Sequence, residues 1–100
     1  MTFLTVDGKK ISLLTFTGPS ADTSVDATSS GTVAIPISSQ NIRIVDVIGI
    51  AQISGLPDGV VLVGFAKSGS NINLTVYNTT SSAVTVSAGS VTVKALVEGF

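Results

Sequence analysis

Apolar and polar residues alternate along much of this chain with the two-residue period of a β-strand. Ile72, Leu74 and Val76 alternate with Asn73, Thr75 and Tyr77, and the segment 91–97 repeats the pattern. Such spacing places apolar side chains on one face of a pleated strand and mostly polar ones on the other. No window of eleven or more residues carries the 3.6-residue apolar stripe of a helix. The pattern predicts an all-β protein.

Turn residues divide the chain into short apolar segments at intervals of roughly 8–12 residues, the spacing typical of sandwiches and barrels. Asp7-Gly8 predicts a hairpin turn, and Leu56-Pro57-Asp58-Gly59 predicts a second turn. We therefore expect a single domain over residues 1–100. It is predicted to be an antiparallel β-sandwich of seven or eight short strands, with jelly-roll or Greek-key order. The Ser/Thr-rich segment 18–31 is expected to form a mobile loop with a weak strand around 23–27.

Three of the predicted strands have special features. Pro36 lies inside the strand 32–38, which predicts an edge strand or a bulge, because proline cannot donate to a ladder. The apolar phase slips in 42–54, which predicts a bulge near Val45-Asp46 that turns Val45 and Val47 inward. The segment 60–66 is apolar on both faces, which predicts a central strand covered on two sides.

The composition leaves little room for chemistry. The chain has no Cys and no His, so it offers no thiol nucleophile, imidazole base, disulfide or ordinary zinc ligand. Asp22 and Asp26 are the only candidate calcium pair, but their spacing matches no calcium loop, and a solvated loop is the simpler interpretation. The glycosylation sequons at Asn73 and Asn78 are interpreted as chance in a Thr-rich chain. We expect neither an enzyme nor a metal or cofactor site.

Charge and targeting signals are equally sparse. Five basic residues are spread among six acidic ones, for a net charge of −1, so phosphate-backbone binding lacks its electrostatic footprint and no nucleic-acid partner is expected. The first ten residues lack a signal peptide's basic start, and Asp7 interrupts their apolar run. The longest apolar stretch carries Arg43 and Asp46, so no membrane span is expected. These features predict a protein made in a cytoplasm.

The balance of apolar and charged residues predicts self-association. Hydrophobic residues make up 44% of the chain and charged residues only 11%, whereas a domain of this size buries roughly 60–70% of its chain surface. Much apolar surface is therefore expected to remain outside, as in an obligate oligomer. The alternative is a monomer whose outer faces carry its 14 Ser and 12 Thr. We expect interface positions at the two termini and on outer faces: Phe3, Leu4, Val60, Tyr77, Leu96 and Phe100.

Residues 55–66, 71–80, 83–86 and 90–93 read in order as a Leu-Pro-x-Gly turn, an apolar strand, an alternating strand ending in Asn, a Thr/Ser-rich turn and a final alternating strand. In this pattern the last two-thirds of the chain resembles small all-β proteins encoded among the structural genes of tailed bacteriophages. The chain departs from the pattern at Tyr77, where those proteins often carry a polar or basic residue.

The resemblance implies a virion component. On this basis we expect a capsid decoration (cement) protein, made in the host cytoplasm, that forms a homotrimer and binds the major capsid protein on the capsid surface. One alternative is a receptor-binding knob of a fibre or tail that recognises a host glycan, and another is a generic assembly or adhesin module of bacterial origin. Sugar sites favour exposed aromatic rings beside amides or carboxylates, and only Tyr77 with Asn73 and Asn78 offers such a group. The resemblance supplies no catalytic or cofactor-binding residue.

Overall fold

The computed structural model describes residues 3–6, 9–37 and 44–99, and side chains from Lys10 onward within these ranges. Every regular element in these ranges is a strand, so the all-β prediction is confirmed for the part of the chain that is described. The strands are β1 (Phe3–Val6), β2 (Lys9–Gly18), β3 (Thr23–Val25), β4 (Ser30–Pro36), β5 (Ile44–Ser54), β6 (Val60–Ser68), β7 (Asn71–Asn78), β8 (Val84–Val86) and β9 (Val91–Gly99).

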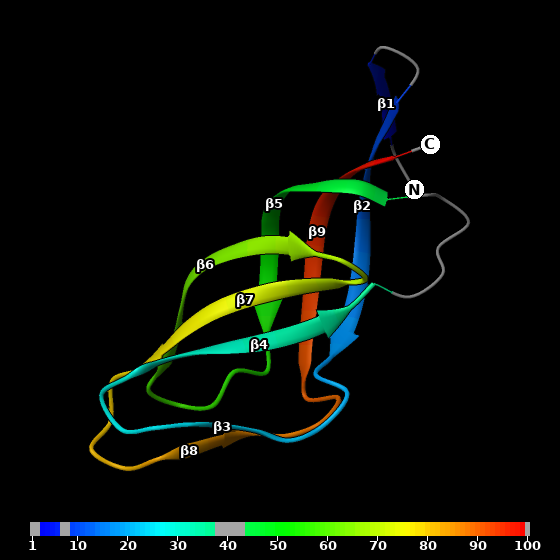
Figure 1. The fold of residues 1–100 in the computed structure, drawn as a ribbon. Helices are drawn as coiled ribbons and strands as arrows, with labels where there is room; N and C mark the ends of the chain where they lie inside the picture. Colours follow the sequence, from blue (N-terminus) through cyan, green and yellow to red (C-terminus); the bar gives the residue numbers. More distant parts are fainter. Residues whose placement is uncertain (1–2, 7–8, 38–43, 100) are drawn as a thin grey trace.

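The strands form three antiparallel sheets. A four-stranded sheet has the order β1-β2-β9-β5, a three-stranded sheet the order β4-β7-β6, and β3 pairs with β8. The three-stranded sheet lies across the four-stranded one, with the β3–β8 pair at one end of the molecule (Figure 1). This arrangement is compatible with a β-sandwich, and the jelly-roll order stays a prediction.

The core lies between the two larger sheets. The alternation read in 71–78 and 91–97 gives their buried faces, because every second residue of β7 and β9 is almost completely shielded from solvent. Phe16 of β2 and Ile35 of β4 complete the two sides of this core. The members that are fully or nearly fully buried are Phe16, Val25, Val33, Ile35, Ile72, Leu74, Val76, Val86, Val91, Val93, Ala95 and Val97.

The strand pairing beside the first predicted turn and the geometry of the second agree with the sequence. β1 and β2 pair from Val6 opposite Lys9, as the Asp7-Gly8 signal predicts, although those two residues lie outside the described ranges. Between β5 and β6, the amide of Val60 donates to the Pro57 carbonyl at 3.1 Å, and Gly59 has a φ of +83°. Gly59 therefore takes the left-handed conformation that the sequence predicts.

Strand β5 departs from regular pairing in three places instead of one. Its register against β9 shifts between Ile44 and Asp46, between Val47 and Gly49, and between Ile50 and Gln52. Each shift leaves one extra residue, and these three residues (Val45, Ile48 and Ala51) are all exposed. The first bulge and the inward position of Val47 are confirmed, but the inward position predicted for Val45 is wrong, because Val45 is 40% exposed.

Strand β6 is an edge strand, so the prediction of a central strand in 60–66 is wrong. It pairs with β7 on one side only, and a register shift between Leu62 and Gly64 makes Val63 an extra residue. Several apolar side chains of this strand remain exposed to solvent. Its apolar residues on both faces therefore do not mean that both faces are covered. Pro36, in contrast, lies at the end of β4, the other edge of the same sheet, as its missing N–H predicts.

Candidate functional site

The candidate calcium pair does not form a site in the structure. The Oδ1 atom of Asp22 accepts a hydrogen bond from the amide of Ala88 at 2.8 Å, which ties the loop after β2 to the turn before β9. Asp26 is exposed. Within the described ranges, no group of three or more His, Cys, Asp or Glu side chains is placed to hold a metal ion. Asp22 therefore acts as a turn-stabilising acceptor, and the mobility predicted for segment 18–31 stays a prediction.

Asn78 is a buried hydrogen-bonding centre that sequence reasoning missed. Its side chain is 0% exposed. Its Nδ2 donates to the carbonyls of Val25 at 3.1 Å and Ser82 at 2.8 Å, and its Oδ1 accepts from the amide of Thr80 at 2.9 Å and from the Thr80 hydroxyl at 2.7 Å. The signal in the sequence was its position, since Asn78 continues the buried phase of Ile72, Leu74 and Val76. Such a buried amide is not available for glycosylation.

Leu96 lies on the outer face of the four-stranded sheet, as the sequence predicts. It pairs with Leu13 of β2 on one side and with Gly49 of β5 on the other. Leu13 is 42% exposed and Leu96 37% exposed. A Cβ added at Gly49 would meet nothing within 4 Å, so the sheet surface beside Leu96 is open. We call the surface formed by Leu13, Gly49 and Leu96 the leucine face.

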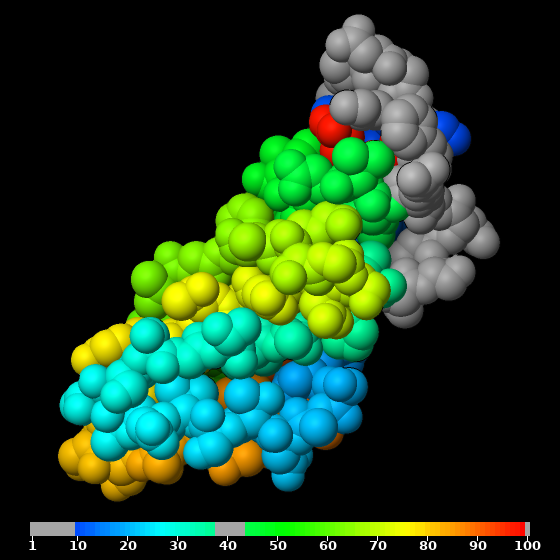
Figure 2. All heavy atoms as spheres, in the orientation of Figure 1, coloured from blue at the N-terminus to red at the C-terminus, as the bar shows by residue number. Residues whose placement is uncertain are grey.

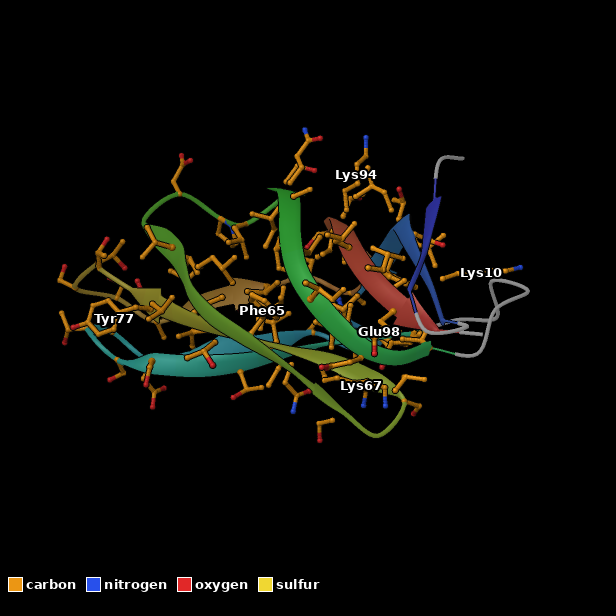
Figure 3. All side chains as sticks on the ribbon, turned by 90° about the horizontal axis from the view of Figure 1, so that it is seen from above. Lys10, Phe65, Lys67, Tyr77, Lys94 and Glu98 are labelled. Atoms are coloured by element: carbon orange, nitrogen blue, oxygen red, sulfur yellow. The ribbon has the colours of Figure 1, made fainter. Side chains whose placement is uncertain are left out.

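Tyr77 also lies on an outer face, but on the other sheet, so the structure does not bring Tyr77 and Leu96 into one patch. It pairs with Ser30 of β4 and Val61 of β6, and Figure 3 shows it at one end of the three-stranded sheet, away from Lys94. Its hydroxyl donates to the carbonyl of Thr28 at 3.0 Å. The Tyr77 hydroxyl is therefore already hydrogen-bonded, and the Asn78 amide is buried. Of the three residues predicted as a glycan site, Asn78 has no polar atom available to a sugar.

Val60 does not have the position that was predicted for it. It is 6% exposed and belongs to the core, opposite Asn78 of β7. The outer-face prediction for Val60 is therefore wrong, because the strand begins with this residue in the inward phase. The next residue, Val61, has the outward position and is 47% exposed.

The first strand and the end of the last strand lie at the same end of the molecule. Phe3 and Leu4 belong to β1 and lie opposite Ser12 and Ile11, while Gly99 lies opposite Lys10 of the same strand β2. Figure 1 shows β1 and the last part of β9 at the end of the fold farthest from β3 and β8. The side chains of Phe3 and Leu4, and all of Phe100, lie outside what the structure describes. The described backbone thus places β1 and the end of β9 on opposite sides of β2, and the predicted docking position Phe100 lies outside the described residues.

In the described part of the chain, no helix has the length and apolar character needed to cross a membrane. Comparison with known proteins adds nothing to the interpretation. No family model, no curated protein and no solved structure matches this chain.

Proposed function

We propose that this protein is a structural component of a phage virion: a capsid decoration protein that forms a homotrimer and binds the major capsid protein. The observation that carries the proposal is the amount of apolar surface left outside the core. Eight large hydrophobic side chains of the described residues are exposed in a chain of 100 residues. Contiguous exposed apolar surface marks association sites in soluble proteins. An assembly protein needs such surfaces and needs no catalytic groups.

The leucine face is the surface we assign to the trimer. Leu13 and Leu96 lie side by side across β2 and β9, and Gly49 leaves the adjoining backbone open to a neighbour. Glycine inside a strand is typical of a site where another backbone approaches closely. Three copies that turn this face toward a common axis would remove both leucines from water.

Changing Leu96→Lys is expected to dissociate the trimer. A charge placed among apolar side chains must be desolvated on association, and residues at the centre of an interface account for most of the binding free energy. Sedimentation equilibrium at low micromolar protein should give three copies of the 10.0 kDa chain for the parent and one copy for the variant. Thr85→Lys, an exposed position on β8, is the control and should leave three copies. A monomeric parent protein would contradict the trimer.

The end of the molecule that carries β1 and the last part of β9 is the surface we assign to the capsid. β1 pairs with β2 at the edge of the four-stranded sheet, so its removal leaves the pairing of β2 with β9 in place. Deleting residues 1–6 is expected to abolish binding to phage heads that lack the decoration protein. The double change Phe3→Ser and Leu4→Ser should weaken binding without shortening the chain.

The measurement that tests this assignment is the occupancy of the heads by each variant, from quantitative gel analysis or cryo-EM. A neutral control is Thr85→Ser, which should bind at full occupancy. Full occupancy by the deletion variant would contradict the assignment of this end. Binding of purified protein to host cells but not to heads would favour the receptor-binding alternative.

A further inference from the structure

The outer face of the three-stranded sheet differs in character from the leucine face. The register of β7 against its two neighbours gives four outward rows: Ser30-Tyr77-Val61, Thr32-Thr75-Gly64, Ala34-Asn73-Ala66 and Pro36-Asn71-Ser68. Figure 2 looks onto this face, with β7 in yellow between β6 and β4. Val63, the extra residue at the bulge of β6, belongs to none of the rows. We call the surface formed by these four rows the β7 face, and it consists mainly of small and polar residues.

Tyr77 presents an aromatic ring at one end of the β7 face, and contacts within the protein fix its position. Tyr77 is 36% exposed, and its hydroxyl donates to the Thr28 carbonyl at 3.0 Å. Thr28 has a φ of +48°, which is uncommon for a β-branched residue, and its amide donates to the Thr80 carbonyl at 3.1 Å. The acceptor of the Tyr77 hydroxyl is thus itself held by the turn after β7. Because the ring is ordered in advance, a ligand that stacks on it causes little further loss of side-chain freedom.

Asn73 contributes an amide to the β7 face that the fold does not use. No hydrogen bond joins its side chain to another residue in the described part of the chain. Its neighbours in the row are Ala34 and Ala66, whose short side chains leave the amide accessible from both sides. The next row is equally open at Gly64, where a Cβ would meet nothing within 4 Å. The Asn73 amide can therefore offer both its donors and its acceptor oxygen to a ligand.

The residue types of the β7 face indicate an uncharged, hydroxyl-rich ligand. The three strands contain one charged residue, Lys67, which pairs with Ile72 in the buried phase and donates to the Gly69 carbonyl at 2.9 Å. The outward rows therefore offer no charge to an acidic ligand. Beyond the row of Tyr77 and Val61 they also lack the large apolar side chains that protein–protein contacts bury at their centre. A sugar fits this face, because its apolar side stacks on an aromatic ring and its hydroxyl groups bond to amides and hydroxyls.

We propose that the β7 face binds a neutral oligosaccharide, with one sugar stacked on the Tyr77 ring and another bonded to the Asn73 amide. These two residues are four apart on one strand, which is roughly 13 Å, so a ligand that contacts both is a chain of sugars. The exposed hydroxyl of Thr75 lies between them on the same face. The site belongs to a single protomer, on the other sheet from the leucine face. It therefore depends neither on the trimer nor on the virion role.

Titration of isotope-labelled protein with sugars, followed by the NMR shifts of its backbone amides, tests the site. The probes are maltohexaose, cellohexaose and chitohexaose, which are neutral chains with different linkages or sugars, and hexagalacturonate, which is acidic. We expect at least one neutral chain to shift the amides of residues 73–77 with a Kd in the millimolar range or tighter. The acidic chain should shift none of them. Absence of these shifts with every neutral chain, or tighter binding of the acidic chain, would overturn the proposal.

Variants of the two contact residues distinguish binding from a structural role. Tyr77→Ala should weaken binding of the best neutral chain about tenfold, and Asn73→Ala about fivefold. Tyr77→Phe keeps the ring and should weaken binding less than Tyr77→Ala does. The control is Thr92→Ala, at an exposed position of β9, which should bind as the parent does. Unchanged affinity of Tyr77→Ala and Asn73→Ala, in proteins whose NMR spectra show the folded state, would overturn the site.

Discussion

Replacing Gly55 with alanine is expected to lower the free energy of unfolding by about 4 kcal/mol, from backbone strain and overpacking together. Gly55 follows β5 with a φ of +92°, a conformation that L side chains rarely adopt. A Cβ at this position would overlap the carbonyl oxygen of Ser90, and backbone there has little freedom to move because β9 begins at Val91. A loss of this size is a large share of the roughly 5–15 kcal/mol that holds a domain together.

Gly89→Ala is the matched control for this prediction. Gly89 also has a positive φ, +71°, but a Cβ there would meet nothing within 4 Å. It therefore carries the conformational cost alone, about 1–2 kcal/mol. Urea unfolding followed by circular dichroism gives both values, and the melting temperature of Gly55→Ala should fall by roughly 20 °C. Equal losses in the two variants would show that the contact with Ser90 contributes nothing.

The sequence predicts this fold best where one face of a strand is buried and the other is solvated. In β7 and β9 the two-residue alternation directly reflects burial, so the inward residues follow from the sequence. Turns are equally direct, because Gly59 is needed where φ is positive. Strand alternation and turn conformation depend only on residues that are close in the sequence, so both can be predicted from it.

Strands β5 and β6 show where this reasoning stops. An apolar residue on both faces of a strand has two explanations, burial under a second layer and exposure at an edge, and the sequence does not distinguish them. The position of β6 beside β7 alone depends on strand order, which is a long-range property. The same limit explains Val60, whose inward phase is set by its pairing with Asn78. The exposed residues Val61 and Val63 of β6 were thus interpreted from the sequence as part of the interior.

Asn78 shows a second limit of prediction from sequence. A polar residue at a buried position of a strand must have hydrogen-bond partners, but the sequence does not show which groups they are. Its amide joins the end of β3 at Val25, which is distant in the sequence, to the end of β7 and the turn at Thr80 and Ser82 that follows it. The backbone amide of Asn78 also donates to the Ser29 carbonyl at 2.9 Å. A single side chain therefore provides a hydrogen-bond partner for the Val25 carbonyl and the Thr80 amide, while the Ser82 carbonyl also accepts from the Thr80 hydroxyl at 2.8 Å.

Asn78→Ala is accordingly expected to cost about 3 kcal/mol, because it leaves the Val25 and Ser82 carbonyls and the Thr80 amide short of a partner. The control is Asn73→Ala on the outer face of the same strand, which should change stability by less than about 0.5 kcal/mol. Asn78→Ser, which retains an acceptor for the Thr80 amide, should recover part of the loss. Urea unfolding at neutral pH measures all three, and equal stability of Asn78→Ala and Asn73→Ala would contradict the role of the buried amide.

The free energy of unfolding of Asn78→Asp is expected to depend on pH. Its carboxylate would still accept from Thr80, but its second oxygen would face the carbonyl oxygens of Val25 and Ser82 in place of the Nδ2 donor. Burial and these carbonyls favour the protonated acid, so the pKa of the new carboxyl rises in the folded state above about 3.9, its value in an unfolded chain. Stability relative to the parent at the same pH should then be greatest below the unfolded pKa and fall as pH rises through the folded one. Asn73→Asp should show no such fall, and a pH-independent difference between Asn78→Asp and the parent would mean that the amide donor is not needed at this position.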